Sequence, residues 1–177
     1  RTDTLDAQGR PLAESSIEGI ERGQIESALA QFRGNIQQIP PMYSALKREG
    51  TALYELARKG VEIDREPRQV RIDHLEVIDW TAPFLVLDID CSSGTYVRSL
   101  VDDLGQALGC GAHVHALRRT WAAPFRHPVE MHTMPTLDGL IGNLSALDAL
   151  LLPIEVMVEG MPSATISGDD LVRFSHG

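Results

Sequence analysis

Apolar residues recur along the chain at two spacings, and each spacing predicts a different kind of element. Four of them lie at positions i, i+3, i+4 and i+7 and would share one face of a helix ended by Gly34: Ile25, Ala28, Leu29 and Phe32. The strongest helical stripe runs over residues 97–108 and ends at Gly109. A shorter one over residues 53–57 ends at Gly60.

A period of two predicts strands in the middle of the chain. Residues 70–80 are rich in β-branched side chains, and in residues 84–91 apolar side chains alternate with polar ones. The short segment 81–83 between them predicts an antiparallel pair. Residues 112–117 are interpreted as a further strand. Because strands and helices mix without a regular βαβ rhythm, the expected class is α+β with a mixed, mostly antiparallel sheet.

The pattern becomes looser from residue 124 onward. Thr136 and Ser145 are expected to be the N-caps of short helices. An apolar run that ends at Pro153 predicts a boundary there. Residues 1–153 would then form one domain, while residues 154–177 are too few to fold alone.

Composition narrows the class of protein. The chain has 177 residues, of which 43% are apolar and 23% charged, and this excludes disordered, collagen-like and disulfide-scaffold proteins. No apolar run reaches the roughly 18 residues that a membrane-spanning helix needs. Cys91 and Cys110 follow no metal-binding or redox spacing, so we expect a cytoplasmic protein in a reducing compartment.

The charge is unevenly distributed. The net charge of −9 argues against nucleic-acid binding over the whole surface. Residues 43–71, however, hold seven basic and five acidic side chains, a balance of +2, and the rest of the chain has a balance of −11. Such a segment could bind phosphates locally, although charge alone favours the simpler interpretation of a solvated helix-and-loop face.

Spacing alone assigns little chemistry to the other polar residues. His113 and His115 could begin a metal site, but no third ligand is suitably spaced, so we expect no metal. Asp102 and Asp103 are successive helical residues whose side chains point about 100° apart, which predicts support of the helix rather than a carboxylate pair. Asp6 is interpreted as a turn residue.

The segment from Cys91 to Arg98 is the most informative, because a strand ends, Gly94 turns the chain and a helix begins. Arg98 in the first helical turn suits a carboxylate held by two parallel hydrogen bonds. Tyr96 could contact a base or the polar edge of a ligand. A buried ion pair beside an aromatic core residue explains the pattern equally well, and the pattern leaves both interpretations open.

Four motifs, in order along the chain, resemble those of TruB-type tRNA pseudouridine synthases. They are Thr-Asp-Thr-x-Asp-x-x-Gly in residues 1–9, Pro-Pro-x-Tyr-Ser-Ala-x-Lys in residues 40–47, Gly-Thr-Tyr-Val-Arg in residues 94–98, and Gly-Ala-His to Leu-Arg-Arg in residues 111–119. The resemblance covers the chain from residue 1 to about residue 153.

The resemblance implies a pseudouridine-synthase fold and an isomerase that converts the T-loop uridine at position 55 of tRNA to pseudouridine. The base would leave its stack, the glycosidic bond would break, and C5 of the rotated uracil would join the ribose. The family implies no cofactor and no metal. Its partner would be tRNA, bound through the T-arm stem-loop. The resemblance implies no membrane association and no obligatory protein partner, and we expect a monomer.

The resemblance also assigns roles residue by residue. Arg98 would pair with the catalytic aspartate, Tyr96 would line the uracil pocket, and Leu117 would be an apolar wall of that pocket. Residues 43–68 would be an inserted RNA-binding thumb. The candidate RNA contacts of this thumb are Tyr43, Lys47, Arg58, Lys59 and Arg68.

One departure concerns the aspartate itself. In the family it belongs to a Gly-x-Leu-Asp-Lys-Pro-like stretch, and this sequence contains no Leu-Asp-Lys. Asp6 belongs to a different motif and is not its replacement. We therefore expect the 177 residues to be inactive on their own, with residues 154–177 as the start of a PUA-like RNA-binding domain. The alternative is a fragment that acts only as a T-arm RNA-binding module.

Overall fold

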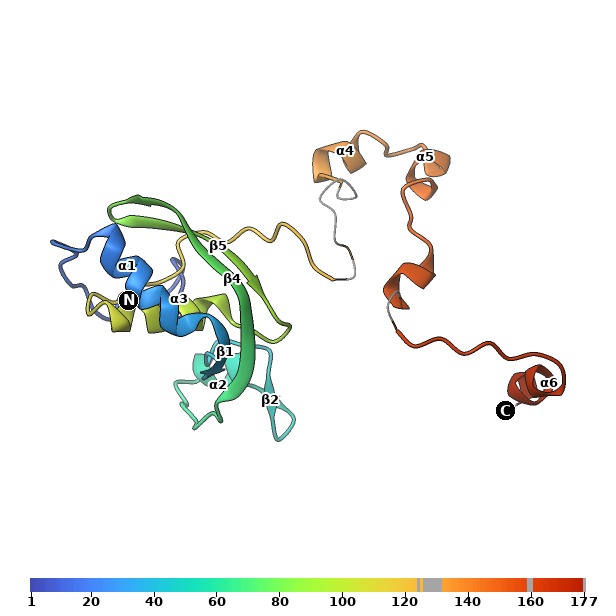
Figure 1. The fold of residues 1–177 in the computed structure, drawn as a ribbon, viewed down its shortest axis with the longest axis horizontal. Helices are drawn as coiled ribbons and strands as arrows, with labels where there is room; N and C mark the ends of the chain where they lie inside the picture. The colour runs from blue at the N-terminus through green and yellow to red at the C-terminus, as the bar shows by residue number, and fades with distance from the viewer. Residues whose placement is uncertain (124, 126–131, 159–160, 177) are drawn as a thin grey trace. The chain divides into compact units, whose positions relative to one another are not determined.

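The computed structural model describes residues 1–123, 125, 132–158 and 161–176. The chain divides into two units, Arg1–Leu117 and Arg118–Gly177 (Figure 1). None of the helices in these residues combines the length and the apolar character needed to cross a bilayer.

The first unit is built on a three-stranded antiparallel sheet with the order β1-β4-β5. The central strand β4 (Arg68–Thr81) pairs with β5 (Phe84–Cys91), which confirms the predicted antiparallel pair. On its other side β4 pairs with β1 (Gly34–Gln38), which the sequence did not predict. β1 has the sequence Gly-Asn-Ile-Gln-Gln, and a strand with a single large apolar residue gives no periodic signal.

An irregularity in β4 sets which of its side chains enter the core. The pairing with β5 shifts between Ile72 and His74. Strict alternation from Ile72 would bury His74, but the extra residue turns His74 outward and Leu75 inward. The buried positions of the strand are therefore Val70, Ile72, Leu75 and Val77.

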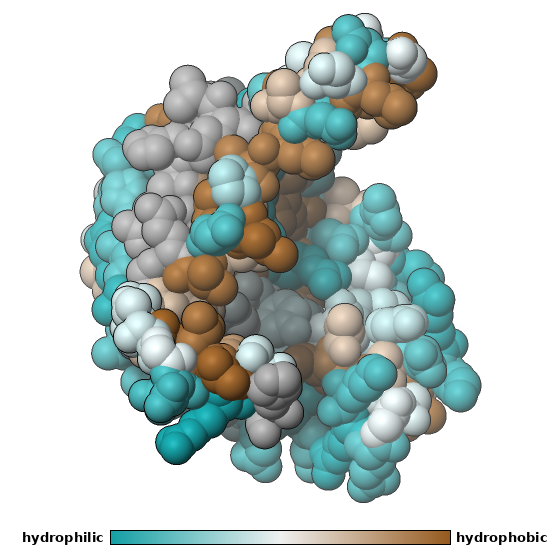
Figure 2. Space-filling model, turned by 90° about the vertical axis from the view of Figure 1, so that its right-hand side faces the viewer, coloured by the Kyte–Doolittle hydropathy of each residue, from teal (hydrophilic) through white to brown (hydrophobic). Residues whose placement is uncertain are grey.

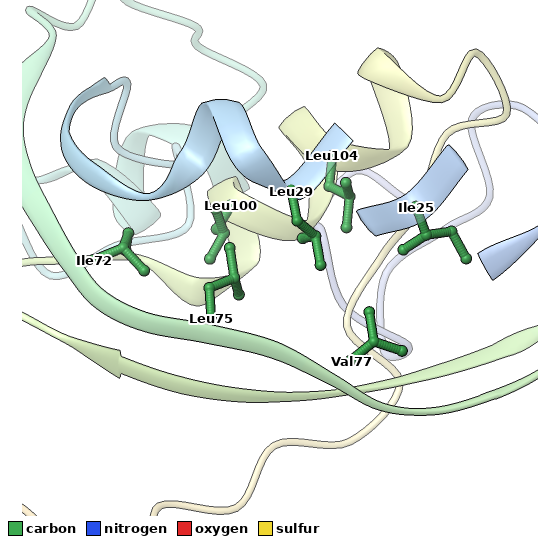
Figure 3. Close-up of a cluster of buried hydrophobic side chains, with 7 residues drawn as sticks. All are labelled: Ile25, Leu29, Ile72, Leu75, Val77, Leu100 and Leu104. Carbon is green, nitrogen blue, oxygen red and sulfur yellow. The ribbon is translucent and has the colours of Figure 1, made fainter. Parts of the chain in front are cut away.

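Two helices cover one face of this sheet. α1 (Arg22–Leu29), extended by the 3-10 turn η1 (Ala30–Phe32), and α3 (Val97–Ala107) both match the predicted helical stripes. Their apolar faces meet β4 in one cluster formed by Ile25, Leu29, Ile72, Leu75, Val77, Leu100 and Leu104 (Figure 3). The first unit is thus a helix layer packed on a sheet, as the α+β prediction requires.

A small extension follows β1 in the chain. It contains the two-residue strands β2 (Lys47–Arg48) and β3 (Thr51–Ala52), which pair antiparallel, and then α2 (Leu53–Arg58). The helix matches the predicted one, and Gly60 follows it with a φ of 72°.

The strand predicted over residues 112–117 is not formed. Val114 makes one isolated parallel bridge to Asp6, flanked by hydrogen bonds from Val114 N–H to the carbonyl of Leu5 and from Ala7 N–H to the carbonyl of Val114. Only residues 112–114 are partly buried, and residues 115–117 are exposed. The prediction was wrong because its neighbour is a tight loop, which offers too few residues for a ladder.

The second unit consists of short helices: α4 (Met134–Asp138), α5 (Leu144–Asp148), the 3-10 turn η3 (Ile154–Val158) and α6 (Asp169–His176). The predicted N-caps Thr136 and Ser145 are wrong. Thr133 and Asn143 cap α4 and α5, because their side-chain oxygens accept from N–H groups three residues later.

No described residue of the second unit is buried. Its exposed apolar side chains include Ile141, Ile154 and Phe174, each about three-quarters exposed or more. The space-filling view accordingly shows brown apolar surface interspersed with teal polar residues (Figure 2). The described residues of this unit therefore contain no core of their own.

Candidate active site

The turn between β5 and α3 places Tyr96 and Arg98 at the end of the sheet. Gly94 has a φ of 85°, a left-handed conformation that favours glycine. Ser92 is fixed to β4, because its N–H donates to the carbonyl of Arg71 over 2.8 Å and its hydroxyl accepts from the N–H of Arg71 over 2.9 Å. The helix therefore begins after a five-residue turn that follows the strand, with Tyr96 as its N-cap residue.

The guanidinium of Arg98 joins three segments of the chain. Nη2 donates to the carbonyl of Tyr43 over 2.7 Å, and Nη1 donates to the carbonyl of Thr4 over 3.1 Å and to Oδ2 of Asp6 over 3.2 Å. The side chain of Arg98 is 26% exposed, so these bonds form in a partly desolvated position. Three of the four sequence motifs meet at this one side chain.

Asp6 is a turn residue, as expected, and it is also the ionic partner of Arg98. Oδ1 accepts from the hydroxyl of Thr4 over 2.7 Å and from the N–H of Gln8 over 3.0 Å. Partial burial acts to raise the pKa of Asp6, but the hydrogen bonds from Thr4 and Gln8 and the charge of Arg98 outweigh it and lower the pKa below its ordinary value. Asp6 is therefore held ionised beside the guanidinium.

Sequence reasoning missed this ion pair. The two residues are 92 positions apart, so no local spacing connects them. The available signal was that Asp6 and Arg98 both lie in motifs of the same family, and two motifs of one family often converge on one site.

The loop that carries Asp6 adopts a strained conformation. Leu5 has a φ of 62°, in the left-handed region that costs a residue other than glycine on the order of 1–3 kcal/mol. The bridge to Val114 and a hydrogen bond from the hydroxyl of Thr2 to the carbonyl of Asp6, over 2.7 Å, hold the loop in place. The loop is thus fixed by its neighbours with the carboxylate of Asp6 against Arg98.

The first turn of α3 is also bound to the end of β1. The side-chain carbonyl of Gln38 accepts from the N–H of Tyr96 over 2.7 Å, and the hydroxyl of Ser99 donates to the carbonyl of Ile39 over 2.9 Å. Leu117 makes none of these contacts and is 65% exposed. The structure therefore brings Tyr43, Tyr96 and Arg98 together, whereas the role of Leu117 stays a prediction.

The contacts of Asp102 confirm the prediction that Asp102 and Asp103 support α3 and do not form a carboxylate pair. The carboxylate of Asp102 accepts from Nε and Nη2 of Arg1 over 2.6 and 2.9 Å, and from the amide of Gln106 over 2.8 Å. Burial, and then the charge of Asp102, raise the pKa of Asp103. Asp102 serves as an anchor between α3 and the N-terminal loop.

Residues 43–68 are tied together and to the site by arginines. Nη1 of Arg48 donates to the carbonyl of Asp64 over 2.7 Å, which joins the β2–β3 hairpin to the loop after α2. Nη1 of Arg65 donates to the carbonyl of Pro40 over 3.3 Å. A shallow hollow of about 500 Å³ lies in this extension, lined by Arg48, Glu49, Thr51, Leu56, Ile63 and Asp64.

The predicted basic contacts are all exposed on this extension: Lys47, Arg58, Lys59 and Arg68. Among the residues that the structure describes, none of these four cations forms an ion pair within 4.0 Å. The guanidinium of Arg58 lies 5.3 Å from the ring centroid of Tyr54, a cation–π contact that keeps the side chain along α2. Their charges thus remain available to an anionic partner.

In the described parts of the chain, no three His, Cys, Asp or Glu side chains are grouped closely enough to hold a metal ion. One of the two histidines considered from the sequence, His115, packs against Phe84 with ring centroids 5.0 Å apart. This contact lies at the turn between β4 and β5.

Comparison with known proteins gives two family matches that meet between Val97 and Arg98, inside the third motif. Residues 1–97 match the family described as "TruB family pseudouridylate synthase (N terminal domain)". The chain belongs to the TruB family. Residues 98–159 of this TruB-family chain match "tRNA pseudouridylate synthase B C-terminal domain".

Individual relatives agree with this assignment. The tRNA pseudouridine synthase B of Stutzerimonas stutzeri is 47% identical over 99% of this chain and 58% of its own length, and that of Haemophilus influenzae is 48% identical over 100% and 57%. This TruB-family chain therefore spans little more than half the length of these curated relatives.

A solved structure extends the comparison to the fold. The structure described as "Crystal Structure of a Cbf5-Nop10-Gar1 Complex" matches with a TM-score of 0.69 and 27% identity, over 89% of this chain and 45% of its own. Together with the helix layer on an antiparallel sheet, this match confirms the predicted α+β pseudouridine-synthase fold.

Asp6→Asn should lower stability at neutral pH and not at acid pH. The folded pKa of Asp6 is depressed, so its ionised form stabilises the fold above the unfolded pKa of about 3.9, and this contribution is lost as the pH falls through the lower folded value. We expect a loss of roughly 1 kcal/mol near pH 7 that shrinks toward pH 3 in urea unfolding followed by circular dichroism. Glu14→Gln, at an exposed position, is the control. A loss of equal size at both pH values would contradict the ionic role.

Proposed function

We propose that the protein is a tRNA pseudouridine synthase that isomerises the T-loop uridine at position 55 of tRNA. The observation that carries the proposal is the guanidinium of Arg98, where three motifs of the TruB family meet. The relatives that match this chain over almost its whole length bear the name tRNA pseudouridine synthase B, which supports the same reaction here.

Arg98 would hold the catalytic carboxylate. A guanidinium has five N–H donors, and the three bonds of Arg98 leave Nε–H and one Nη2–H without an acceptor among the described residues. A second carboxylate placed there would gain charge-assisted hydrogen bonds, and the positive charge would keep it ionised. Asp6 already accepts a hydrogen bond from Nη1, so its role is to orient the guanidinium. The catalytic aspartate is then a different residue, from outside these 177 residues.

The reaction exchanges one bond to the ribose for another. The aspartate acts as nucleophile or base, the bond between C1′ and N1 of uridine breaks, the uracil rotates, and a bond forms between C1′ and C5. C5 loses a proton and N1 gains one, so no external reactant is required. Unstacking the uridine costs a few kcal/mol, which contacts in a pocket formed by Tyr96 and Leu117 would offset.

Residues 43–68 would bind the T-arm by its phosphates. Their exposed cations lie on this extension, which Arg65 links to Pro40. Pro40 belongs to the same motif as Tyr43, whose carbonyl accepts from Arg98. Contacts to phosphates position an RNA without reading its sequence, and the flipped base supplies the specificity. This arrangement supports a thumb that places the T-loop over the site.

Arg98→Lys in the full-length protein should lower kcat for pseudouridine formation by about 100-fold, because one ammonium cannot hold two carboxylates and two carbonyls in the geometry of a guanidinium. The affinity for tRNA should change less than about threefold. Arg33→Lys is the matched control, since Arg33 also donates to a backbone carbonyl, that of Leu75, and its ionic partner is Glu26 rather than a group around Arg98. Equal losses in both variants would contradict a specific role for Arg98.

The 177 residues alone should form no detectable pseudouridine in a T-arm stem-loop RNA, measured by liquid chromatography of the digested nucleosides. The full-length protein should convert the same RNA, because it supplies the aspartate. Turnover by the 177 residues would overturn the proposal that the aspartate lies elsewhere. In that event Asp6→Ala would show whether Asp6 is the catalytic group.

Arg58→Ala combined with Lys59→Ala should weaken T-arm binding and flatten its salt dependence. Each phosphate contact that is lost should reduce the slope of log K against log salt by about 0.7–0.9. Arg10→Ala, an exposed arginine outside residues 43–68, is the control and should leave the slope unchanged. An unchanged slope in the double variant would argue against a thumb in this position, and would also remove the support for a fragment that acts only as an RNA-binding module.

A further inference from the structure

Gln38 is the last residue of β1 and is 2% exposed. Its side-chain carbonyl accepts the N–H of Tyr96, the N-cap residue of α3, across 58 positions of sequence. We propose that Gln38 is a positioning residue that sets the start of α3, and with it Tyr96 and Arg98, for the reaction proposed above. The inference rests on that proposed function for its catalytic part.

The start of a helix leaves several N–H groups without partners inside the helix. In α3 the side chain of the N-cap residue, Tyr96, forms no capping hydrogen bond. Gln38 meets part of this need from a neighbouring strand, over the short distance of 2.7 Å. A cap supplied by another element fixes the helix in space as well as stabilising its end.

The strand that carries Gln38 is itself held firmly. Gln38 pairs with Arg68 at the end of the β1–β4 ladder, and β4 carries the core residues against which α3 packs. Next to Gln38, the carbonyl of Ile39 accepts the hydroxyl of Ser99. The two contacts bracket Arg98, so a shift of this turn moves the guanidinium away from its three acceptors.

The other half of the Gln38 amide makes the role testable. Nε2 is buried and has no hydrogen-bond partner among the described residues. The amide therefore acts through its oxygen alone. Glutamate keeps an oxygen acceptor for Tyr96 N–H in either protonation state, and as a carboxylate it also suits the positive end of the helix dipole. Methionine has a similar shape and removes the acceptor.

The test compares Gln38→Met, Gln38→Glu and the control Gln37→Met, an exposed position on the same strand, in the full-length protein. We expect Gln38→Met to lower kcat about tenfold, with the Kd for tRNA within about twofold, because the reacting groups are displaced while the RNA-binding surface is intact. Gln38→Glu should stay within about threefold of the parent. Gln38→Asn, which withdraws the acceptor by one methylene, tests the same contact if the methionine variant does not fold.

A second readout does not depend on activity. Hydrogen exchange measured by mass spectrometry should be about tenfold faster in Gln38→Met for peptides covering residues 96–100, and unchanged in Gln38→Glu. Equal behaviour of Gln38→Met and Gln37→Met, or equal loss in Gln38→Met and Gln38→Glu, would overturn the inference. If the parent protein forms no pseudouridine, the proposed function fails, and the exchange rates still decide whether Gln38 sets the start of α3.

Discussion

The apolar core shared by α1, α3 and β4 is the packing on which the rest of the structure depends. Leu100 and Leu104 of α3 are almost completely buried in this core, and burying a leucine contributes about 1.5–3 kcal/mol. At the far end, Gly105 lies so close to the backbone of Ala112 that a Cβ would collide with it. The helix is therefore confined along its length, and its first turn can carry the site.

The site is assembled mostly from backbone groups around one cation. Arg98 binds two carbonyls and one carboxylate, and the segments that provide them are held by further hydrogen bonds of their own. A charge surrounded in this way resists displacement, because moving it leaves several acceptors unpaired at once. Order at the site thus comes from many shared contacts and not from a single strong one.

The sequence predicts those parts of the fold that repeat regularly. Both helices of the core and the β4–β5 pair follow from periodic apolar residues, and the turn at Gly94 follows from its glycine. β1 escapes prediction because its residues are polar and its partner, β4, is distant in sequence. The register shift between Ile72 and His74 could not be predicted for a different reason. Alternation of apolar and polar residues carries no information on where an extra residue is inserted in a strand.

The site divides in the same manner. The motif around Arg98 marks a helix start with a useful charge, yet which groups surround that charge depends on packing across more than 50 residues. The pairing with Asp6 and the contact of Gln38 with Tyr96 are tertiary facts of this kind. The misplaced caps at Thr136 and Ser145 are local errors, because each helix began slightly earlier than the pattern suggested.

The extension formed by residues 43–68 leaves the body and returns to it at neighbouring points. Tyr43 is bound to α3 through Arg98, and Arg68 pairs with Gln38, which is bound to the same helix. Once the ends of a loop are held together, lengthening it costs little, about 0.6 kcal/mol for each doubling. This segment can therefore be lengthened, shortened or exchanged as a module while the arrangement around Arg98 stays the same.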